Sequence, residues 1–290
     1  MKAPTMLDTI RSMLGVPACA IPLSICKPAK SYLLEKVGLS SEGTAILFAI
    51  PYVITADVDA PDRNISLYAV PKDYHGYIKE LESSMLPSLH DLYPEHTFSF
   101  FADHSPILEV DAAARAGLGV LGMNGLLITP DFGSFVFIGE LLTSADYVTV
   151  TGALLPSFPE HPPLCEGCGA CLDACPSGCH FDTRDGCLSS LTQKKGDLTR
   201  DEMMAIREGG LVWGCDRCQI VCPHNRQLIR NRVDTPIPYF REDRLIHLDS
   251  DVFDAMNDED FSHRAYSWRG RSVVRRNIEI LTLTNERRKT

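Results

Sequence analysis

Nine of the eleven cysteines fall in one stretch of the chain, and eight of these have spacings that bind metal clusters. The first group reads Cys165-x2-Cys168-x2-Cys171-x3-Cys175-Pro176, and the second reads Cys215-x2-Cys218-x3-Cys222-Pro223, with Cys187 between them. Four cysteines at the first spacing, followed by proline, build a [4Fe-4S] cluster, and in two-cluster proteins the fourth cysteine ligates the other cluster. The sequence therefore predicts two clusters, one bound by Cys165, Cys168, Cys171 and Cys222 and the other by Cys175, Cys187, Cys215 and Cys218.

Cysteines in such an arrangement have two other common uses. Structural zinc also binds paired Cys-x2-Cys, but it needs one tetrahedron of four ligands, so eight ligands in two interleaved sets favour clusters. A disulfide framework is disfavoured because eleven is an odd number and the chain is far longer than a small stapled scaffold. The remaining cysteines are expected to be small buried hydrophobic residues; these are Cys19, Cys26 and Cys179.

The composition is that of a folded protein with a substantial core. The chain has 290 residues, 44% of them hydrophobic, which is enough for two domains. Its formal net charge of -10 disfavours nonspecific attraction of the whole molecule to nucleic acid. No apolar run reaches the ~20 residues that span a bilayer, and the N-terminal residues contain neither an apolar signal region nor a twin-arginine motif. We therefore expect no membrane segment and a cytoplasmic location.

Apolar periodicity predicts a mixture of helices and strands, and hence an α/β (α+β) fold. Helices are expected at residues 5–14, 73–92, 108–116 and 199–208, with Pro87 kinking or shortening the second of them. Strands are expected at residues 44–50, 97–101, 134–142 and 147–151. Thr199 and Glu202 are spaced as a capping box at the start of the last helix.

Two loops in the first half of the chain carry residues of chemical interest. Asp103 follows an expected strand, a place from which a rigid support offers a side chain to a cleft, although a turn or helix cap is the commoner use of aspartate before Ser-Pro. The run from Gly117 to Gly122 satisfies G-x-G-x-x-G, but it follows a helix and opens none, which argues against a dinucleotide site. We expect it to be a helix stop and a bare loop.

Prolines between residues 156 and 163 mark a boundary, and the predicted division of the chain is 1–157, 158–232 and 233–290. The tail from Phe261 to Thr290 is basic: against Glu279 and Glu286 it carries Arg264, Arg269, Arg271, Arg275, Arg276, Arg287, Arg288 and Lys289. A solvated helix face is the ordinary explanation of such a tail. A local phosphate-binding patch is the more specific one.

The order of these pieces resembles the epoxyqueuosine reductase family. Residues 101–109 (FADHSPILE), 114–128 and 133–142 look like the cobalamin-binding half of that family, and residues 214–225 (GCDRCQIVCPHN) are similar to its second cluster motif. The resemblance covers roughly residues 44–280. It implies a nitroreductase-like cobalamin-binding domain, a ferredoxin-like domain with two clusters and a short helical tail, in the three parts given above.

The resemblance also implies a reaction. In the family, electrons enter through the clusters, reduce the cobalt of a bound cobalamin, and convert an epoxide on a tRNA wobble base into an alkene. The partners implied are the tRNA anticodon stem-loop and an external electron donor of the ferredoxin or flavodoxin type. Asp103 matches the family's proton donor, and expelling the epoxide oxygen creates an alkoxide that a carboxylic acid can protonate. The positions that match cofactor contacts are Asp103, Asn124, Gly125, Ser134, Phe135, Ile138 and Asp216.

The chain departs from the family's usual sequence at several positions. Met123 replaces a lysine, Lys72 replaces the arginine of an Arg-Asp-Tyr-His signature, His104-Ser105 replaces Ser-Ala, and His224 replaces a tryptophan. Losing a guanidinium fork is not neutral at a bidentate site. Two other functions stay open: the same cofactors acting on a halogenated or epoxidised small molecule, as in reductive dehalogenases, and a non-catalytic electron carrier or corrinoid-reactivating protein.

Overall fold

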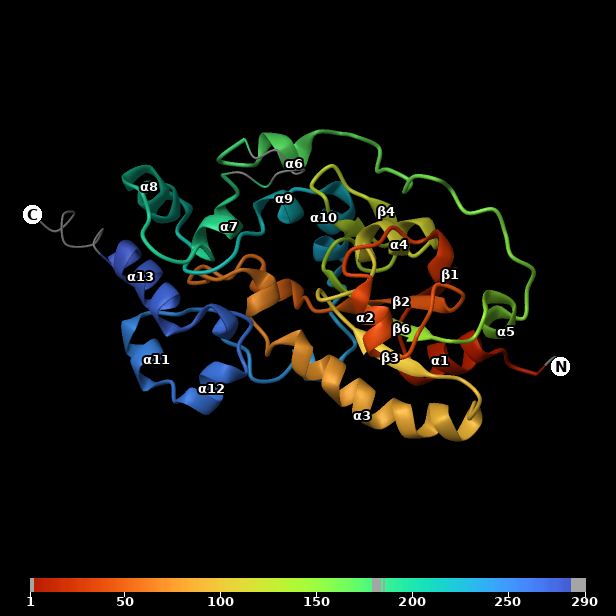
Figure 1. The fold of residues 1–290 in the computed structure, drawn as a ribbon. Coiled ribbons are helices and arrows are strands. Elements are labelled where there is room, and N and C mark those ends of the chain that lie inside the picture. Colours follow the sequence, from red (N-terminus) through yellow and green to blue (C-terminus); the bar gives the residue numbers. More distant parts are fainter. Residues whose placement is uncertain (1–2, 179–183, 185, 283–290) are drawn as a thin grey trace, which may run out of the picture. The chain divides into compact units, whose positions relative to one another are not determined.

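The structure, a computed structural model, describes residues 3–178, 184 and 186–282 (Figure 1). The chain forms two compact units, each built from discontinuous segments. The first unit comprises Met1–Ile50, Tyr74–Gly122 and Leu126–Gly167, and the second comprises Pro51–Asp73, Met123–Gly125 and Cys168–Thr290. Over the described residues, no helix combines the length and the apolar character needed to cross a bilayer.

A four-stranded sheet with the order β1-β2-β6-β3 forms the centre of the first unit. The strands are β1 (Ala18–Pro22), β2 (Thr44–Pro51), β3 (Phe98–Phe101) and β6 (Val136–Thr143). Every residue of β2 is buried, as the uninterrupted apolar run predicts for a central strand. Strand β3 pairs with β6 in antiparallel register, with Phe101 opposite Glu140. This register places a carboxyl group of β6 beside the end of the strand that leads to Asp103.

Five α-helices complete the first unit: α1 (Met6–Leu14), α2 (Tyr32–Lys36), α3 (Tyr74–Leu92), α4 (Glu109–Arg115) and α5 (Tyr147–Thr151), with a short 3-10 turn, η1 (Leu23–Ile25). Helix α1 begins with a capping box between Thr5 and Asp8 and ends at Gly15 in the left-handed conformation. Helix α3 runs past Pro87 to Leu92, so this proline does not end it. The expected helices at 5–14, 73–92 and 108–116 are confirmed within one or two residues.

One expected strand is wrong, because residues 147–151 form the helix α5. Asp146 caps its first turn by accepting a hydrogen bond of 2.7 Å from the amide of Thr149, and Gly152 closes it in the left-handed conformation. A run rich in Val, Thr and Tyr has strand propensity, but a cap at each end outweighs that propensity over a single turn.

The glycine-rich run forms the start of a two-stranded hairpin, β4 (Val120–Leu121) with β5 (Leu127–Ile128). Gly117 ends α4 with a φ of 88°, and a Cβ on Gly119 would lie 2.4 Å from the carbonyl oxygen of Ile128. Both glycines are therefore required by the backbone itself. The run follows a helix and enters a hairpin, so it is not a dinucleotide fingerprint.

The second unit is helical. Its α-helices are α6 (Ala170–Asp173), α7 (Leu188–Thr192), α8 (Arg200–Gly209), α9 (Arg217–Ile220), α10 (Pro223–Asn231), α11 (Ser250–Ala255), α12 (Asp258–Ser262) and α13 (Arg271–Thr282). Its 3-10 turns are η2 (Thr55–Asp57), η3 (Leu67–Ala69), η4 (Pro238–Phe240) and η5 (Ser267–Arg269). The predicted capping box of Thr199 and Glu202 opens α8.

Aromatic residues fill the main core of the second unit. Trp213, Tyr266 and Phe253 have no exposed surface, and the indole nitrogen of Trp213 donates a hydrogen bond of 2.8 Å to Tyr68. Tyr68 comes from the segment 51–73, which ends about 90 residues before the first cluster cysteine. Packing of that segment against the later helices explains why the second unit is discontinuous.

Candidate active site and metal centres

None of the eight cysteines assigned to the clusters forms a disulfide in the described structure. Cys168 is exposed, Cys222 is buried and the other six are partly buried. Cys165 belongs to the first unit and the other seven belong to the second. Over the described residues, no group of three His, Cys, Asp or Glu side chains is arranged to hold a single metal ion.

Two thiols of the second predicted cluster, those of Cys215 and Cys218, have raised pKa values. Burial, with the neighbouring Cys215 and Cys187 adding to it, raises the pKa of Cys218 to about 12, and a hydrogen bond with Asn124 opposes this rise. Burial also raises the pKa of Cys215, and the neighbouring Cys187 raises this pKa further. Iron compensates the negative charge of grouped thiolates, so this donor set fits a cluster.

Glycine and proline shape the loop that carries the second cysteine motif. Gly214 has a φ of 70°, and a Cβ there would lie 2.4 Å from the Cβ of Ser66. Pro223 occupies the first turn of α10 directly after Cys222. Proline is favoured at that position because its missing amide hydrogen would have no partner there. The motif therefore folds as a tight loop that ends in a helix.

Asp216, a predicted cofactor contact, is only 1% exposed. Its carboxylate accepts hydrogen bonds from Arg63 at 2.8 Å, from the amide of Leu67 at 2.9 Å and from the hydroxyl of Ser66. Burial raises the pKa of Asp216, while the charge of Arg63 and these hydrogen bonds lower it. The side chain thus joins the segment 51–73 to the loop of the cluster ligands.

Asp103 lies after β3 in the left-handed backbone conformation, with a φ of 57°. Aspartate adopts this conformation less readily than glycine, and such strain is concentrated at functional sites. Its carboxylate accepts a hydrogen bond from the hydroxyl of Tyr74 and lies 3.8 Å from Nε2 of His75. The side chain is nevertheless 65% exposed. An acid held this way is accessible to a substrate.

The ring of Tyr74 is itself fixed by stacking. It lies parallel to Phe137 of β6, with ring centroids 4.0 Å apart and planes within 10° of each other. The hydroxyl of Tyr74 is thereby aimed at Asp103 from a rigid support. Sequence analysis assigned no role to Tyr74 or His75, although both belong to the family-like signature at residues 72–75.

Two further carboxyl groups lie next to the Asp103 loop. Oε2 of Glu109, the first residue of α4, accepts a hydrogen bond of 3.2 Å from the amide of Asp103. Glu140 has no exposed surface, and its Oε2 accepts a hydrogen bond of 2.7 Å from the hydroxyl of Ser105. Sequence analysis missed both. The signal for Glu140 was a single carboxylate inside the apolar run 134–142.

The altered residues of the family-like motifs have local partners. Nδ1 of His104 lies 2.8 Å from the ammonium of Lys30, and both side chains are exposed. The ammonium of Lys72 lies 4.7 Å from the centre of the Tyr239 ring, a cation–π contact. These contacts give the replacements at positions 72 and 104 local partners in the present structure.

The other predicted cofactor contacts are largely buried. Asn124 hydrogen-bonds to Cys218, so its side chain reaches a predicted cluster ligand within the second unit. Gly125 has a φ of 75°, which completes the turn before β5. The remaining three belong to the first unit and are under 10% exposed; they are Ser134, Phe135 and Ile138.

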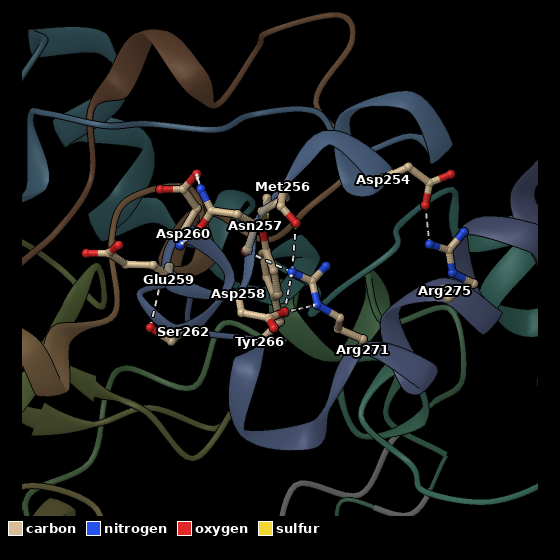
Figure 2. A network of polar contacts seen from close by, with 10 residues as sticks. All are labelled: Asp254, Met256, Asn257, Asp258, Glu259, Asp260, Ser262, Tyr266, Arg271 and Arg275. Carbon is tan, nitrogen blue, oxygen red and sulfur yellow. Dashed lines mark hydrogen bonds and ion pairs between the residues drawn. The ribbon is translucent and has the colours of Figure 1, made fainter.

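The basic tail is tied to its own unit by hydrogen bonds and ion pairs (Figure 2). Arg271 contacts Asp258 at 3.1 Å and the backbone oxygen of Met256 at 2.7 Å, and Arg275 pairs with Asp254. Elsewhere in the tail, Arg264 pairs with Asp243 and Arg276 donates to the backbone oxygens of residues 194 and 196. Arg287, Arg288 and Lys289 lie outside the described residues, as does Cys179. The described tail arginines therefore act mainly within the fold.

Exposed arginines are found instead on α10 and at its C-terminal end. Arg226 and Arg230 lie on this helix, which begins directly after Cys222, and Arg232 is its C-cap; all three side chains are exposed. A cavity of about 470 Å³ lies beside Cys187 in the same unit, lined also by Ser189, Ser190, Lys194 and Arg269. Sequence analysis had not found this cavity, because its walls come from three separate helical segments.

Comparison with known proteins agrees with the cysteine pattern. Residues 164–225 match a family described as a 4Fe-4S double cluster binding domain. The epoxyqueuosine reductase of Lactococcus garvieae is 29% identical over 85% of this chain and 70% of its own length. That of Listeria monocytogenes is 33% identical over 72% of this chain and 54% of its own length.

The fold of the chain is also similar to that of a solved epoxyqueuosine reductase. The crystal structure of an epoxyqueuosine reductase with an epoxyqueuosine-modified tRNA stem-loop has a TM-score of 0.69 to this chain, at 23% identity, covering 95% of this chain and 79% of that one. The chain spans about half the length of most curated relatives it matches. The chain shares the mixed α/β fold of that solved protein, and most of the segment that matches the double-cluster family lies in the second unit. The sequence, the fold and the double-cluster segment therefore all make this chain similar to epoxyqueuosine reductases.

Proposed function

We propose that this chain reduces the epoxide of epoxyqueuosine in tRNA to the alkene of queuosine, using two [4Fe-4S] clusters and a cobalamin. The observation that carries the proposal is an exposed Asp103 in a strained conformation between the hydroxyl of Tyr74 and the carboxylate of Glu109. Its support is the similarity of the chain to epoxyqueuosine reductases. Bound cobalamin would supply two electrons to a carbon of the substrate.

Asp103 is the proposed proton donor. Opening the epoxide breaks a carbon–oxygen bond and leaves an alkoxide, and loss of that oxygen as water completes the alkene after two electrons and two protons have been added. A carboxylic acid beside the oxygen provides one proton at the moment the charge develops. Tyr74 orients the acid, because its hydroxyl is bonded to Asp103 and its ring is stacked on Phe137.

The residues present fit an apolar ring cofactor. Leu164 is 71% exposed. Its backbone is nevertheless ordered, because it forms a β-bridge with Leu121. In this bridge the amide of Leu121 donates to the carbonyl of residue 163, and the amide of Cys165 donates to the carbonyl of Leu121. A large apolar side chain held in water on an ordered backbone favours a surface that something apolar covers. We propose that the contacts with the ring come from Asn124, Gly125, Ser134, Phe135 and Ile138, with Asp216 fixing the adjacent cluster loop.

The proposed assignment of parts follows the sequence: cobalamin-binding residues in 1–157, both clusters in 158–232, and a supporting tail in 233–290. Cys165, Cys168, Cys171 and Cys222 would bind one cluster, and Cys175, Cys187, Cys215 and Cys218 the other. The cavity beside Cys187 gives an external electron donor a short route to the second cluster. A tRNA substrate places the reaction in the cytoplasm.

The proposed contact with the anticodon stem-loop is made by the exposed arginines of α10. Arg226, Arg230 and Arg232 follow a cluster ligand directly, and phosphate contacts from arginine position an RNA without reading its sequence. The described tail arginines are less available, because they are paired within the fold.

The test is turnover. Anaerobic protein reconstituted with iron, sulfide and cobalamin is given epoxyqueuosine-containing tRNA and a reductant, and the released nucleosides are identified by mass spectrometry. The proposal expects queuosine. Full cofactor loading without queuosine would remove the tRNA assignment, and conversion of a small epoxide or halide under the same conditions would favour the small-molecule reductase.

A further inference from the structure

The structure provides Asp103 with a support that the proposed reaction does not explain. Asp103 is non-glycine, exposed and in the left-handed conformation, so a hydrogen bond to its backbone must help to hold it there. That bond is donated by the Asp103 amide to Oε2 of Glu109 at 3.2 Å. An ionised acceptor makes such a bond roughly twice as strong as a neutral one.

Glu109 in turn borders a second, fully buried carboxyl group. Glu140 lies opposite Phe101 in the sheet, and its Oε2 is bonded to the Ser105 hydroxyl, which also accepts from the amide of Ile107 at 3.1 Å. Its other oxygen, Oε1, is buried without a hydrogen-bond partner in the described structure. A carboxylate oxygen in that position is costly, whereas a protonated one can donate.

The charged and titratable groups around this pair come from several elements. Glu109 is influenced by Asp103 of the loop and His75 of α3, and Glu140 is influenced by Glu109, Asp103 and Ser105. Cys26, packed on the same core, is influenced by Glu140 as well. Arg115 acts on Cys26, but among the groups that shift Glu109 or Glu140 the one that can be a cation is His75, at the exposed side of Asp103. A fully buried acid and a partly buried acid with a single such cation near them do not both ionise readily.

The ionisation of the pair agrees with this geometry. Burial raises the pKa of Glu109 to about 7, with the charge of Asp103 adding to it. Burial raises the pKa of Glu140 well above its ordinary value, and Glu109 adds to that rise. The proton is therefore retained most firmly by Glu140, and Glu109 is the member that ionises near neutral pH.

We propose that Glu140, as a neutral acid, donates to the Glu109 carboxylate and that Glu109 thereby holds the backbone of Asp103 in its active conformation. Both are positioning residues for Asp103, and the inference rests on the proposed function of Asp103 as the acid. The chain of contacts runs from the Ser105 hydroxyl through Glu140 and Glu109 to the Asp103 amide. It fixes a proton donor that is itself on an exposed loop.

Glutamine substitutions separate the two roles. Glu140→Gln keeps a neutral donor in the same shape, so the Asp103 loop should stay in place. Glu109→Gln removes the negative acceptor, so the bond to the Asp103 amide should weaken. Glu80→Gln, on the exposed side of α3, is the matched control.

The first measurement needs no turnover. Amide hydrogen exchange of residues 101–108 is followed by mass spectrometry in the cluster-loaded full chain. Exchange should become faster in Glu109→Gln and stay as in the wild type in Glu140→Gln and Glu80→Gln. Isotope-edited infrared spectra should also show one protonated glutamic acid at about neutral pH that is missing in Glu140→Gln. Unchanged exchange in Glu109→Gln, or absence of the protonated acid, would overturn the inference.

The second measurement is the pH dependence of kcat and KM. Glu109→Gln should lower kcat about 10–100-fold with little change in KM, as expected for a hydrogen bond to a charged group. Glu140→Gln should keep kcat near neutral pH and extend activity to higher pH, because its amide cannot lose the proton. Equal losses in both variants at every pH would indicate core packing alone. If the wild type converts no tRNA, the proposed function fails, while the exchange and infrared results still decide the inference.

Discussion

The guanidinium of Arg63 and the carboxylate of Asp216 form a buried ion pair with 2.8 Å between Nη1 and Oδ2. The arginine side chain is 9% exposed and the aspartate side chain 1%. Asp216 lies between two predicted ligands of the second cluster, Cys215 and Cys218. The pair therefore fastens the cluster loop to a residue that is 153 positions away in sequence.

Removing one partner of this pair should be strongly destabilising. Arg63→Leu leaves a buried carboxylate without its cation, which costs about 3–5 kcal/mol. Anaerobic urea unfolding of the cluster-loaded protein measures the loss. Asp254→Asn is the comparison, because it breaks an exposed ion pair with Arg275 and should have only a small effect. Equal shifts of the two midpoints would show that Asp216 is not held by Arg63.

Tyr74→Phe should lower kcat about 10–100-fold without changing the fold. The substitution deletes the hydroxyl that is bonded to Asp103 and keeps the ring that stacks on Phe137. Steady-state kinetics with tRNA measure the effect. Tyr93→Phe removes a hydroxyl bonded to Thr9 at 3.3 Å, away from the acid, and serves as the control. A full rate in Tyr74→Phe would refute its role in orienting Asp103.

Cysteine substitutions should divide into two classes by iron content. Cys218→Ala removes a ligand of one cluster and should lower the iron bound by about half. Cys26→Ala should leave iron unchanged, because Cys26 is half-buried against the core of the first unit and its pKa is raised by burial to about 12. Anaerobic metal analysis distinguishes the two. Loss of iron from Cys26→Ala would contradict the ligand assignment.

Binding of tRNA should depend on salt through the arginines of α10. Each phosphate contact that is removed should reduce the slope of log affinity against log salt by about 0.7–0.9. Arg226→Gln and Arg232→Gln are expected to do so, whereas Arg275→Gln is not, because Arg275 pairs with Asp254. Filter binding over a salt series provides the slopes. An unchanged slope in the α10 variants would place the RNA elsewhere.

Stability should fall as pH rises through the neutral range. The pKa of Glu109 is raised from 4.5 to about 7, so the folded protein binds a proton that the unfolded chain releases between these values. The stability from this proton is complete below pH 4.5 and is lost as pH rises toward about 7. Glu140 continues the same trend to higher pH. Glu140→Gln should flatten the curve of unfolding midpoint against pH, and a steeper curve would contradict the shared proton.

Much of the fold could be predicted from the sequence where local signals agree. The apolar run of β2, the amphipathic α1 and the capping box of α8 each combine a pattern with a terminus signal, and the structure has all three. The run 147–151 has strand composition, yet the caps Asp146 and Gly152 make it a helix. Caps of single-turn helices are easily outweighed by composition when the sequence is read alone.

The candidate site, like the fold, could be predicted from the sequence only in part. The cysteine ligands could be predicted because their spacing within a short segment is the signal itself. Glu109 and Glu140 could not, because their contact depends on the pairing of β3 with β6, which joins residues about 40 apart in sequence. Arg63 and Asp216 are further apart still. Sequence patterns identify residues that act together within a short segment. The contacts of Glu140 and Arg63 form only when distant segments pack together.

The visible spectrum of the anaerobically purified chain, recorded before and after addition of cobalamin and accompanied by metal analysis of the same sample, tests the central claim most directly. Two iron–sulfur clusters beside a corrinoid site predict iron with matching sulfide, broad iron–sulfur absorbance, and a shifted corrinoid band that stays with the protein on gel filtration. Zinc in place of iron, or a corrinoid that elutes free with an unshifted band, would contradict it.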